Sequence, residues 1–104
     1  MIWIISGTQD GREIGAALAD REQSKPEGER REILMTVVSQ YGKVLAAHKG
    51  LDIEVGRFRE EDMLRVIREK GISLILDASH PYAAIVSETA RAACTKAGID
   101  YVRY

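Results

Sequence analysis

The sequence contains one cysteine, two prolines and one tryptophan, and its apolar runs are only a few residues long. One cysteine excludes an intrachain disulfide and a cysteine-cluster metal site. Cys94 lies among alanines in a helical pattern, which favours a small buried side chain over a reactive nucleophile. The opening residues Met1 to Ile5 lack a basic segment and are too short for a signal peptide or a membrane span. We therefore expect a cytoplasmic protein.

An excess of one charge sign is also missing. Fifteen Lys and Arg stand against 16 Asp and Glu, a formal net charge of -1, and the two signs are mixed along the chain. This balance gives no reason to expect a nucleic acid or an anionic membrane as a partner. At 104 residues, 45% of them hydrophobic, residues 1–104 are expected to form a single domain with a modest core.

Short apolar runs alternate with helical patterns along the whole chain. We expect strands at residues 2–6, 33–39, 51–55, 72–76 and 99–103, and helices over residues 11–20, 41–48, 60–70 and 81–98. Residues 21–30 are polar and are expected to form an exposed loop. This alternation predicts an α/β fold, a three-layer Rossmann-like domain with a five-stranded parallel sheet in the order 3-2-1-4-5.

Two glycines follow the first strand, in a turn that leads into a helix. Gly7 and Gly11 would let backbone N–H groups approach a pyrophosphate, with the Ser6 and Thr8 hydroxyls and the Arg12 charge beside it. The spacing matches neither the Gly-x-Gly-x-x-Gly fingerprint nor the P-loop pattern. A plain tight turn with a capped helix explains the same residues, and both interpretations stay open.

Ser39, Tyr41 and Lys43 follow the second strand, where dinucleotide-binding folds contact the adenosine ribose. An acidic residue there would accept a hydrogen bond from the ribose 2′-hydroxyl and repel a 2′-phosphate. This sequence has a serine and a lysine instead, which favours NADPH over NADH. An ordinary loop serine and a solvated lysine are the alternative interpretation.

Residues 77–83, Asp-Ala-Ser-His-Pro-Tyr-Ala, are the most informative stretch of the chain. They follow a buried strand and precede a helical pattern, which is where open α/β sheets place their ligands. The His-Pro pair would hold the His80 imidazole at the cleft, or His80 would cap the helix. Asp77 is interpreted as a turn or cap acceptor. Arg57, after the third strand, either lies in a β-turn or reaches a phosphate or carboxylate.

Four stretches of the sequence, residues 6–13, 38–42, 55–57 and 77–83, resemble in that order the amino-terminal half of the precorrin-6A reductase and cobalt-precorrin-6A reductase family. The last resembles the family's Asp-Ala-Thr-His-Pro-Phe-Ala segment and is the most specific. Ser6 stands where a glycine is common in the family. The resemblance implies a cobalamin-biosynthesis oxidoreductase that passes a hydride from NADPH or NADH to a ring double bond of precorrin-6A or cobalt-precorrin-6A.

With this resemblance, we expect His80 to be catalytic, as proton donor or orienting group, and Arg57 to contact acidic arms of the tetrapyrrole substrate. The residues expected to bind the cofactor are Ser6, Gly7, Thr8, Gly11, Arg12, Ser39, Tyr41, Lys43, Ser79, Pro81 and Tyr82. No metal site is expected. Family members have two Rossmann-like domains with the active cleft between them, so a missing carboxyl-terminal domain would leave this chain incomplete and inactive alone.

The alternative is a non-catalytic flavodoxin-like module that senses a nucleotide or receives a phosphoryl group. A receiver needs clustered acids after the first strand, an acceptor aspartate on the middle strand and a lysine after the fifth. Here the first strand ends in Ser-Gly-Thr and the fifth in Val-Arg-Tyr. The pattern therefore favours the reductase.

Overall fold

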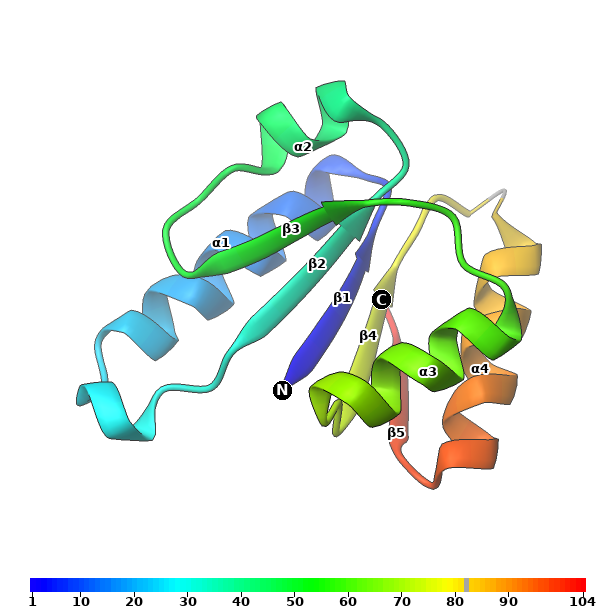
Figure 1. Ribbon diagram of the computed structural model, residues 1–104. Coiled ribbons are helices and arrows are strands. Elements are labelled where there is room, and N and C mark those ends of the chain that lie inside the picture. Colours follow the sequence, from blue (N-terminus) through cyan, green and yellow to red (C-terminus); the bar gives the residue numbers. More distant parts are fainter. Residues whose placement is uncertain (82) are drawn as a thin grey trace.

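The computed structural model describes residues 1–81 and 83–104, which form a parallel sheet of five strands with helices on both faces (Figure 1). The strands are β1 (Ile2–Ser6), β2 (Ile33–Val37), β3 (Leu51–Val55), β4 (Leu74–Ala78) and β5 (Asp100–Arg103). The helices are α1 (Gln9–Gln23), α2 (Gln40–Ala46), α3 (Glu60–Lys70) and α4 (Ala84–Ala97), with a 3₁₀ turn at Glu27–Glu29. The strand order is β3-β2-β1-β4-β5, so the predicted fold class and order are confirmed.

This order places β1 beside β4, with Ser6 opposite Ala78 at their carboxyl ends. The chain fills the sheet from β1 towards β3, then crosses back to add β4 and β5 on the other side. The connections that follow β1 and β4 therefore leave the same rim of the sheet and diverge (Figure 1). In open α/β sheets such a switch point forms the crevice where ligands bind.

Each face of the sheet has its own apolar core. Trp3 and Ile5 of β1 pack on the side of α3 and α4, whereas Ile2 and Ile4 pack on the side of α1 and α2. Because alternate strand residues point to opposite faces and both faces are covered, β1 is apolar from end to end until Ser6. The carboxyl ends of the strands are therefore flanked by helices on both faces of the sheet.

Gly15 of α1 lies against the end of the Met35 side chain of β2. A Cβ atom on Gly15 would lie 2.2 Å from Cε of Met35, whose side chain is fully buried. Only a glycine allows this approach without moving the methionine. Gly15 therefore leaves room for the end of the Met35 side chain beneath α1.

Helix α1 is longer than the sequence pattern predicts. It ends at Gln23 and so includes three residues of the segment expected to be a loop. Glu22, only 7% exposed, accepts hydrogen bonds from the Arg31 backbone N–H (2.7 Å) and from Lys25 Nζ (2.8 Å). These contacts stabilise a polar turn of helix that has no apolar periodicity to reveal it.

The expectation that Pro81 occupies the first turn of a helix is wrong. Helix α4 begins at Ala84, and it is preceded by a turn in which the Ala83 N–H donates to the His80 carbonyl oxygen (2.8 Å). Proline is favoured at the second position of such a turn, and it disfavours helical backbone at the residue before it. The turn lengthens the irregular segment between β4 and α4.

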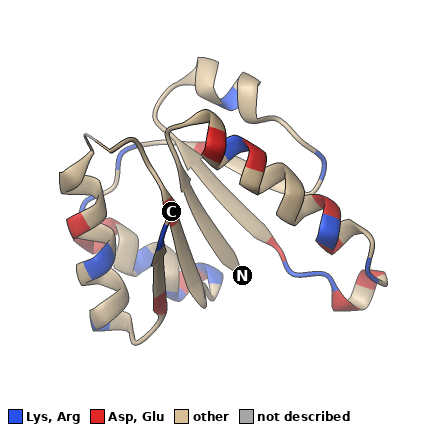
Figure 2. Cartoon of the chain, turned by 180° about the vertical axis from the view of Figure 1, so that it is seen from behind, with Lys and Arg blue, Asp and Glu red and all other residues tan. Residues whose placement is uncertain are grey.

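Charged residues of both signs are interspersed along the helices and connections, and the central strands carry few of them (Figure 2). Within the described ranges, no helix has both the length and the apolar character needed to cross a membrane.

Candidate active-site rim at the carboxyl ends of the strands

The loops that follow β1 and β4 lie side by side at this rim. A Cβ atom on Gly7 would lie 3.1 Å from the His80 backbone nitrogen and 3.4 Å from Ser79 Cα. The Thr8 hydroxyl donates to the Ala78 carbonyl oxygen (3.2 Å) and accepts from the Gly11 N–H (3.0 Å). Thr8 therefore caps α1 and ties its start to the end of β4.

Both glycines of the first turn pack tightly against residues 78–80. A Cβ atom on Gly11 would lie 3.0 Å from Ala78 Cβ and 3.2 Å from the Ala78 carbonyl oxygen, which belong to a central strand. The capped-turn interpretation is therefore correct for the backbone. A phosphate-binding role for the same turn stays a prediction, because a glycine can also serve close packing of a helix against a strand in dinucleotide folds.

A small hollow opens beside this turn, between the ends of β1 and β2. Its volume is about 120 Å³, and it is lined by Ser6, Gly7, Arg12, Val37, Val38, Ser39 and Gly42. The Ser39 hydroxyl accepts from the Gly42 N–H (3.0 Å). Four water molecules in bulk liquid take up a comparable volume at about 30 Å³ each, so the hollow has room for a phosphate group.

Hydrogen-bond donors without partners line the hollow. Ser6 is 5% exposed, and over residues 1–81 and 83–104 neither its hydroxyl nor the Arg12 guanidinium has a hydrogen-bond or ion-pair partner. The nearby Glu13 carboxylate accepts from Gln9 instead (3.0 Å). No carboxylate lines the hollow in the described part of the chain, so its charge and its donors suit an anion.

On the other side of the rim, Asp77 is completely buried in a hydrogen-bonded network. Its carboxylate accepts from the Ser79 N–H (3.0 Å), the Ser87 hydroxyl (2.6 Å) and the Tyr101 hydroxyl (2.6 Å). Burial by itself raises the pKa of Asp77, but these hydrogen bonds outweigh it and leave the pKa below its ordinary value. Asp77 is thus a turn acceptor, and its burial argues against phosphorylation at this residue.

Arg103, at the end of β5, completes the network. Its Nη1 lies within hydrogen-bond distance of the Asp77 carbonyl oxygen (3.2 Å) and Oδ1 (3.2 Å), and of the Ser79 carbonyl oxygen (2.9 Å) and Oγ (3.3 Å). The pKa of Tyr101 is raised, first by burial and then by its hydrogen bond to Asp77, so the phenol stays a donor. The network orders the backbone that leads into His80.

His80 and Pro81 are exposed at the rim directly after this network. Helix α4 has Ala83 at its N-cap position and no side-chain cap, so the alternative interpretation of His80 as the cap is wrong. Ser79 is 7% exposed, and its hydroxyl faces Arg103 and Ser87 (3.5 Å between the two serine oxygens). The predicted cofactor residue Tyr82 lies outside the described residues.

Arg57 borders a second, apolar cavity of about 220 Å³ on the α3 and α4 side of the rim. Phe58 forms one wall, in edge-to-face contact with Trp3 at 5.4 Å between ring centroids and 78° between planes. Trp3 Nε1 donates to the Thr36 hydroxyl (3.0 Å), which anchors the indole. Arg57 itself is exposed, so a cation stands at the mouth of an apolar cavity.

The structure does not bring Tyr41 and Lys43 into either rim cavity. Both are exposed on α2, Tyr41 with 72% of its surface accessible. Of the residues predicted to bind the cofactor, four line the 120 Å³ hollow: Ser6, Gly7, Arg12 and Ser39. Thr8 and Ser79 instead form hydrogen bonds within the protein near the contact between the two loops, and Gly11 packs there.

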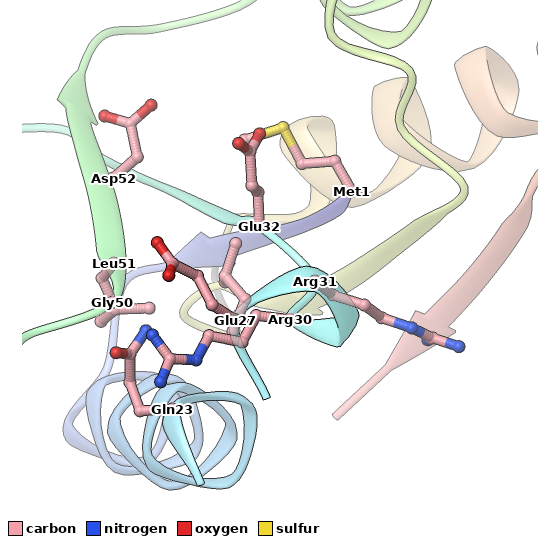
Figure 3. A pocket seen from close by; sticks show the side chains of 10 residues that line it. Met1, Gln23, Glu27, Arg30, Arg31, Glu32, Gly50, Leu51 and Asp52 are labelled. Carbon is pink, nitrogen blue, oxygen red and sulfur yellow. The ribbon is translucent and has the colours of Figure 1, made fainter. Parts of the chain in front are cut away.

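A further cavity, of about 600 Å³, lies at the opposite end of the sheet (Figure 3). Met1, Ile33 and Leu51 mark the amino ends of their strands there, and the Arg31 side chain points away from the other lining residues. Helix N-termini do not converge on this end, so it lacks the feature that favours anion binding at the carboxyl rim. Across the described ranges, no three His, Cys, Asp or Glu side chains are placed to hold a metal ion.

The rim also includes Ser87, Tyr101 and Arg103, which were not predicted from the sequence. They lie 10 to 26 residues from Asp77 and belong to no local motif. The available signal was the spacing of Tyr101 and Arg103, which places both on one face of β5. Cys94 is 1% exposed with its pKa raised to about 11 by burial, in agreement with an inert thiol.

Comparison with known proteins gives a consistent result. A protein-family model described as "Precorrin-6x reductase CbiJ/CobK" matches residues 1–104. The chain is 33% identical over 104 residues to the cobalt-precorrin-6A reductase of Priestia megaterium, covering 100% of this chain and 38% of that protein. It is 29% identical over 104 residues to the cobalt-precorrin-6A reductase of Synechocystis sp., covering 99% of this chain and 37% of that protein.

Among solved structures, the chain resembles CobK precorrin-6A reductase with a TM-score of 0.75 at 22% sequence identity, covering 99% of this chain and 36% of that one. This likeness supports the fold. The chain spans somewhat more than a third of the length of the curated relatives it matches. Since the family model matches all 104 residues, the chain belongs to the precorrin-6x reductase CbiJ/CobK family.

Proposed function

We propose that this chain is the dinucleotide-binding part of an NAD(P)H-dependent reductase that acts on precorrin-6A or cobalt-precorrin-6A in the cytoplasm. The observation that carries the proposal is the contact between the Gly7 turn and the Ser79–His80 backbone at the switch point of the sheet. A dinucleotide lies across such a switch point in Rossmann folds. Membership of the reductase family supports the same chemistry.

The phosphates are proposed to bind beside the Gly7 turn. The hollow there offers the Arg12 guanidinium and the hydroxyls of Ser6 and Ser39, and the first turn of α1 points at the same rim. A helix N-terminus and a guanidinium both favour a negatively charged group. The lack of an acid in the hollow is compatible with NADPH as well as NADH.

The nicotinamide end is proposed to lie over the β4–α4 loop, near His80 and Pro81. A reduced nicotinamide bound there supplies the hydride for a ring double bond of the tetrapyrrole. His80 is exposed at that point, where it can orient the substrate or donate the proton that the reduction requires. Arg57 stands at the mouth of the apolar cavity, where it can pair with an acidic arm of the macrocycle.

The full reaction is proposed to need more protein than these residues. The relatives are more than twice as long as the matched region, and a pocket for a macrocycle needs a second wall. We propose that residues 1–104 correspond to the amino-terminal domain of a two-domain reductase. The chain alone should then bind the dinucleotide and show no reductase activity.

Calorimetric titration of the 104-residue chain with NADPH and NADH tests this function. Saturable binding of either dinucleotide is the expected result, and binding of neither would overturn the proposal. Gly7→Ala, whose new Cβ would meet the His80 nitrogen at 3.1 Å, should weaken binding. Gly28→Ala adds a Cβ with nothing within 4 Å and should bind as the unmodified chain does.

A further inference from the structure

Between β4 and α4, the described residues 79–81 belong to no strand or helix. Beyond Ala78 the next helical residue is Ala84, and the segment contains the exposed His80. Its conformation therefore depends on side chains from elsewhere in the fold. Those side chains come from α4 and from β5, the strand at the sheet edge beside β4.

Two side chains of β5 converge on the start of this segment. Tyr101 donates its hydroxyl to Asp77 Oδ2 (2.6 Å), and Arg103 Nη1 reaches two oxygens of Asp77 and two of Ser79. Ser87 of α4 donates to the same Oδ2 (2.6 Å), which ties the first turn of the helix back to β4. The contacts thus fix the start of the segment and link it to α4, the helix that follows.

The position of this segment also decides the fit of the neighbouring loop. The His80 nitrogen leaves just enough room for Gly7 without a Cβ, so a shift of the Ser79–His80 backbone would press on the Gly7 turn. Charge-assisted hydrogen bonds such as those of Arg103 are strong and directional, and they resist such a shift. The β5 side chains are thus linked physically to both loops of the rim.

We propose that Tyr101 and Arg103 are positioning residues, which act through Asp77 and Ser79 to orient His80 and the Gly7 turn for dinucleotide binding. This inference rests on the proposed function for its binding consequence and on the geometry alone for the orientation of His80. Neither β5 side chain lines the rim cavities. Their effect on a ligand is therefore indirect.

The chain offers a matched pair of substitutions for a test. Tyr101→Phe removes the phenol hydroxyl that donates to Asp77, whereas Tyr104→Phe removes a hydroxyl three residues away on a side chain that is 65% exposed. Tyr104 contacts Asp77 through its backbone N–H (2.9 Å), which this substitution keeps. Arg103→Lys, which keeps the charge and loses the guanidinium geometry, adds a second variant.

The imidazole signals in a proton NMR spectrum supply the direct readout. The sequence has two histidines, and His48 serves as an internal reference because its Nε2 pairs with Asp20 Oδ1 (2.7 Å) on the α1 side of the molecule. In folded Tyr101→Phe we expect the His80 signal to shift or broaden while the His48 signal stays in place. Tyr104→Phe should leave both signals unchanged.

Dinucleotide titration supplies the second readout. Tyr101→Phe and Arg103→Lys, measured under conditions where both are folded, should bind the dinucleotide about tenfold more weakly, the usual order for loss of a supporting contact behind a ligand-binding group. A purely structural role would lower the midpoint of urea unfolding and leave both the His80 signal and the affinity of the folded protein unchanged. That result would overturn the proposal.

The two proposals fail separately. If the unmodified chain binds neither NADPH nor NADH but the His80 signal still responds to Tyr101→Phe, the dinucleotide function is wrong and the positioning role stands. If the chain binds a dinucleotide and Tyr101→Phe matches Tyr104→Phe in both readouts, the positioning role is wrong and the dinucleotide function stands.

Discussion

The two halves of the rim differ in what their polar side chains bind. On the β4 side, the Asp77 carboxylate is fully buried and accepts from four neighbours, which are Ser79, Ser87, Tyr101 and Arg103. On the β2 side, Ser6 and Arg12 surround an open hollow, and neither side chain has a partner among the residues that the structure describes.

This difference distinguishes polar groups that support the structure from polar groups that can bind a ligand. Polar groups that satisfy one another inside the protein stabilise a loop and leave nothing for a ligand. Donors that line a hollow and stay without protein partners can be satisfied by an anion that enters it. The β4 half is therefore expected to control stability and loop geometry, and the β2 half to control affinity.

The largest effect is expected from removing Asp77, the centre of the hydrogen-bonded β4 half of the rim. Asp77→Ala leaves the Tyr101 and Ser87 hydroxyls and the Arg103 guanidinium without their shared acceptor, and it should lower the free energy of unfolding by about 3 kcal/mol. Urea unfolding followed by circular dichroism measures the loss. Asp52→Ala, on an exposed carboxylate of β3, should change stability by less than about 0.5 kcal/mol. Equal effects of the two substitutions would contradict the comparison.

A smaller effect is expected from protonating Asp77 without removing it. Because the folded pKa of this carboxyl is lowered, its stabilisation is fully present above its unfolded pKa near 4 and is lost as the pH falls through the folded pKa. Stability should therefore decline below about pH 4. The decline should be shallower in Asp77→Asn, which cannot titrate, and urea unfolding at pH 7 and pH 3 compares the two. Parallel declines would show that other carboxylates carry the acid sensitivity.

The smallest effect on folding, and the clearest effect on binding, is expected in the β2 half of the rim, beside the hollow. Arg12→Gln should leave urea stability within about 0.5 kcal/mol and weaken NADPH binding about tenfold, the order of one hydrogen bond to a charged group. Lys43→Gln, exposed outside both rim cavities, should change affinity by less than about twofold. A larger effect at Lys43 than at Arg12 would show that the phosphate does not bind in the hollow.

Much of the fold could be predicted because its signals are local. Buried strands are recognisable as short apolar runs. Acidic residues mark the start of α3, and basic residues followed by Gly71 mark its end. The end of α1 and the start of α4 could not be predicted. One depends on Glu22 contacts with Arg31 and Lys25, and the other on a turn that contains Pro81.

The site was predicted unevenly for the same reason. The segments at residues 6–12 and 77–81 are visible as polar stretches after apolar runs, and the structure brings them into contact. The network around Asp77 was invisible, since its partners come from α4 and β5. Tyr41 and Lys43 were predicted from their place after β2, yet the helix turns them outward.

The strand order and the rim where the polar segments emerge could be inferred from the sequence, because apolar periodicity marks each strand and right-handed crossovers restrict how parallel strands are arranged. The pairing of the polar side chains at that rim became known from the folded structure. The hydrogen bond between Tyr101 and Asp77 joins atoms that approach only after the sheet has assembled, and the lack of a partner for Arg12 among the described residues likewise depends on the assembled fold.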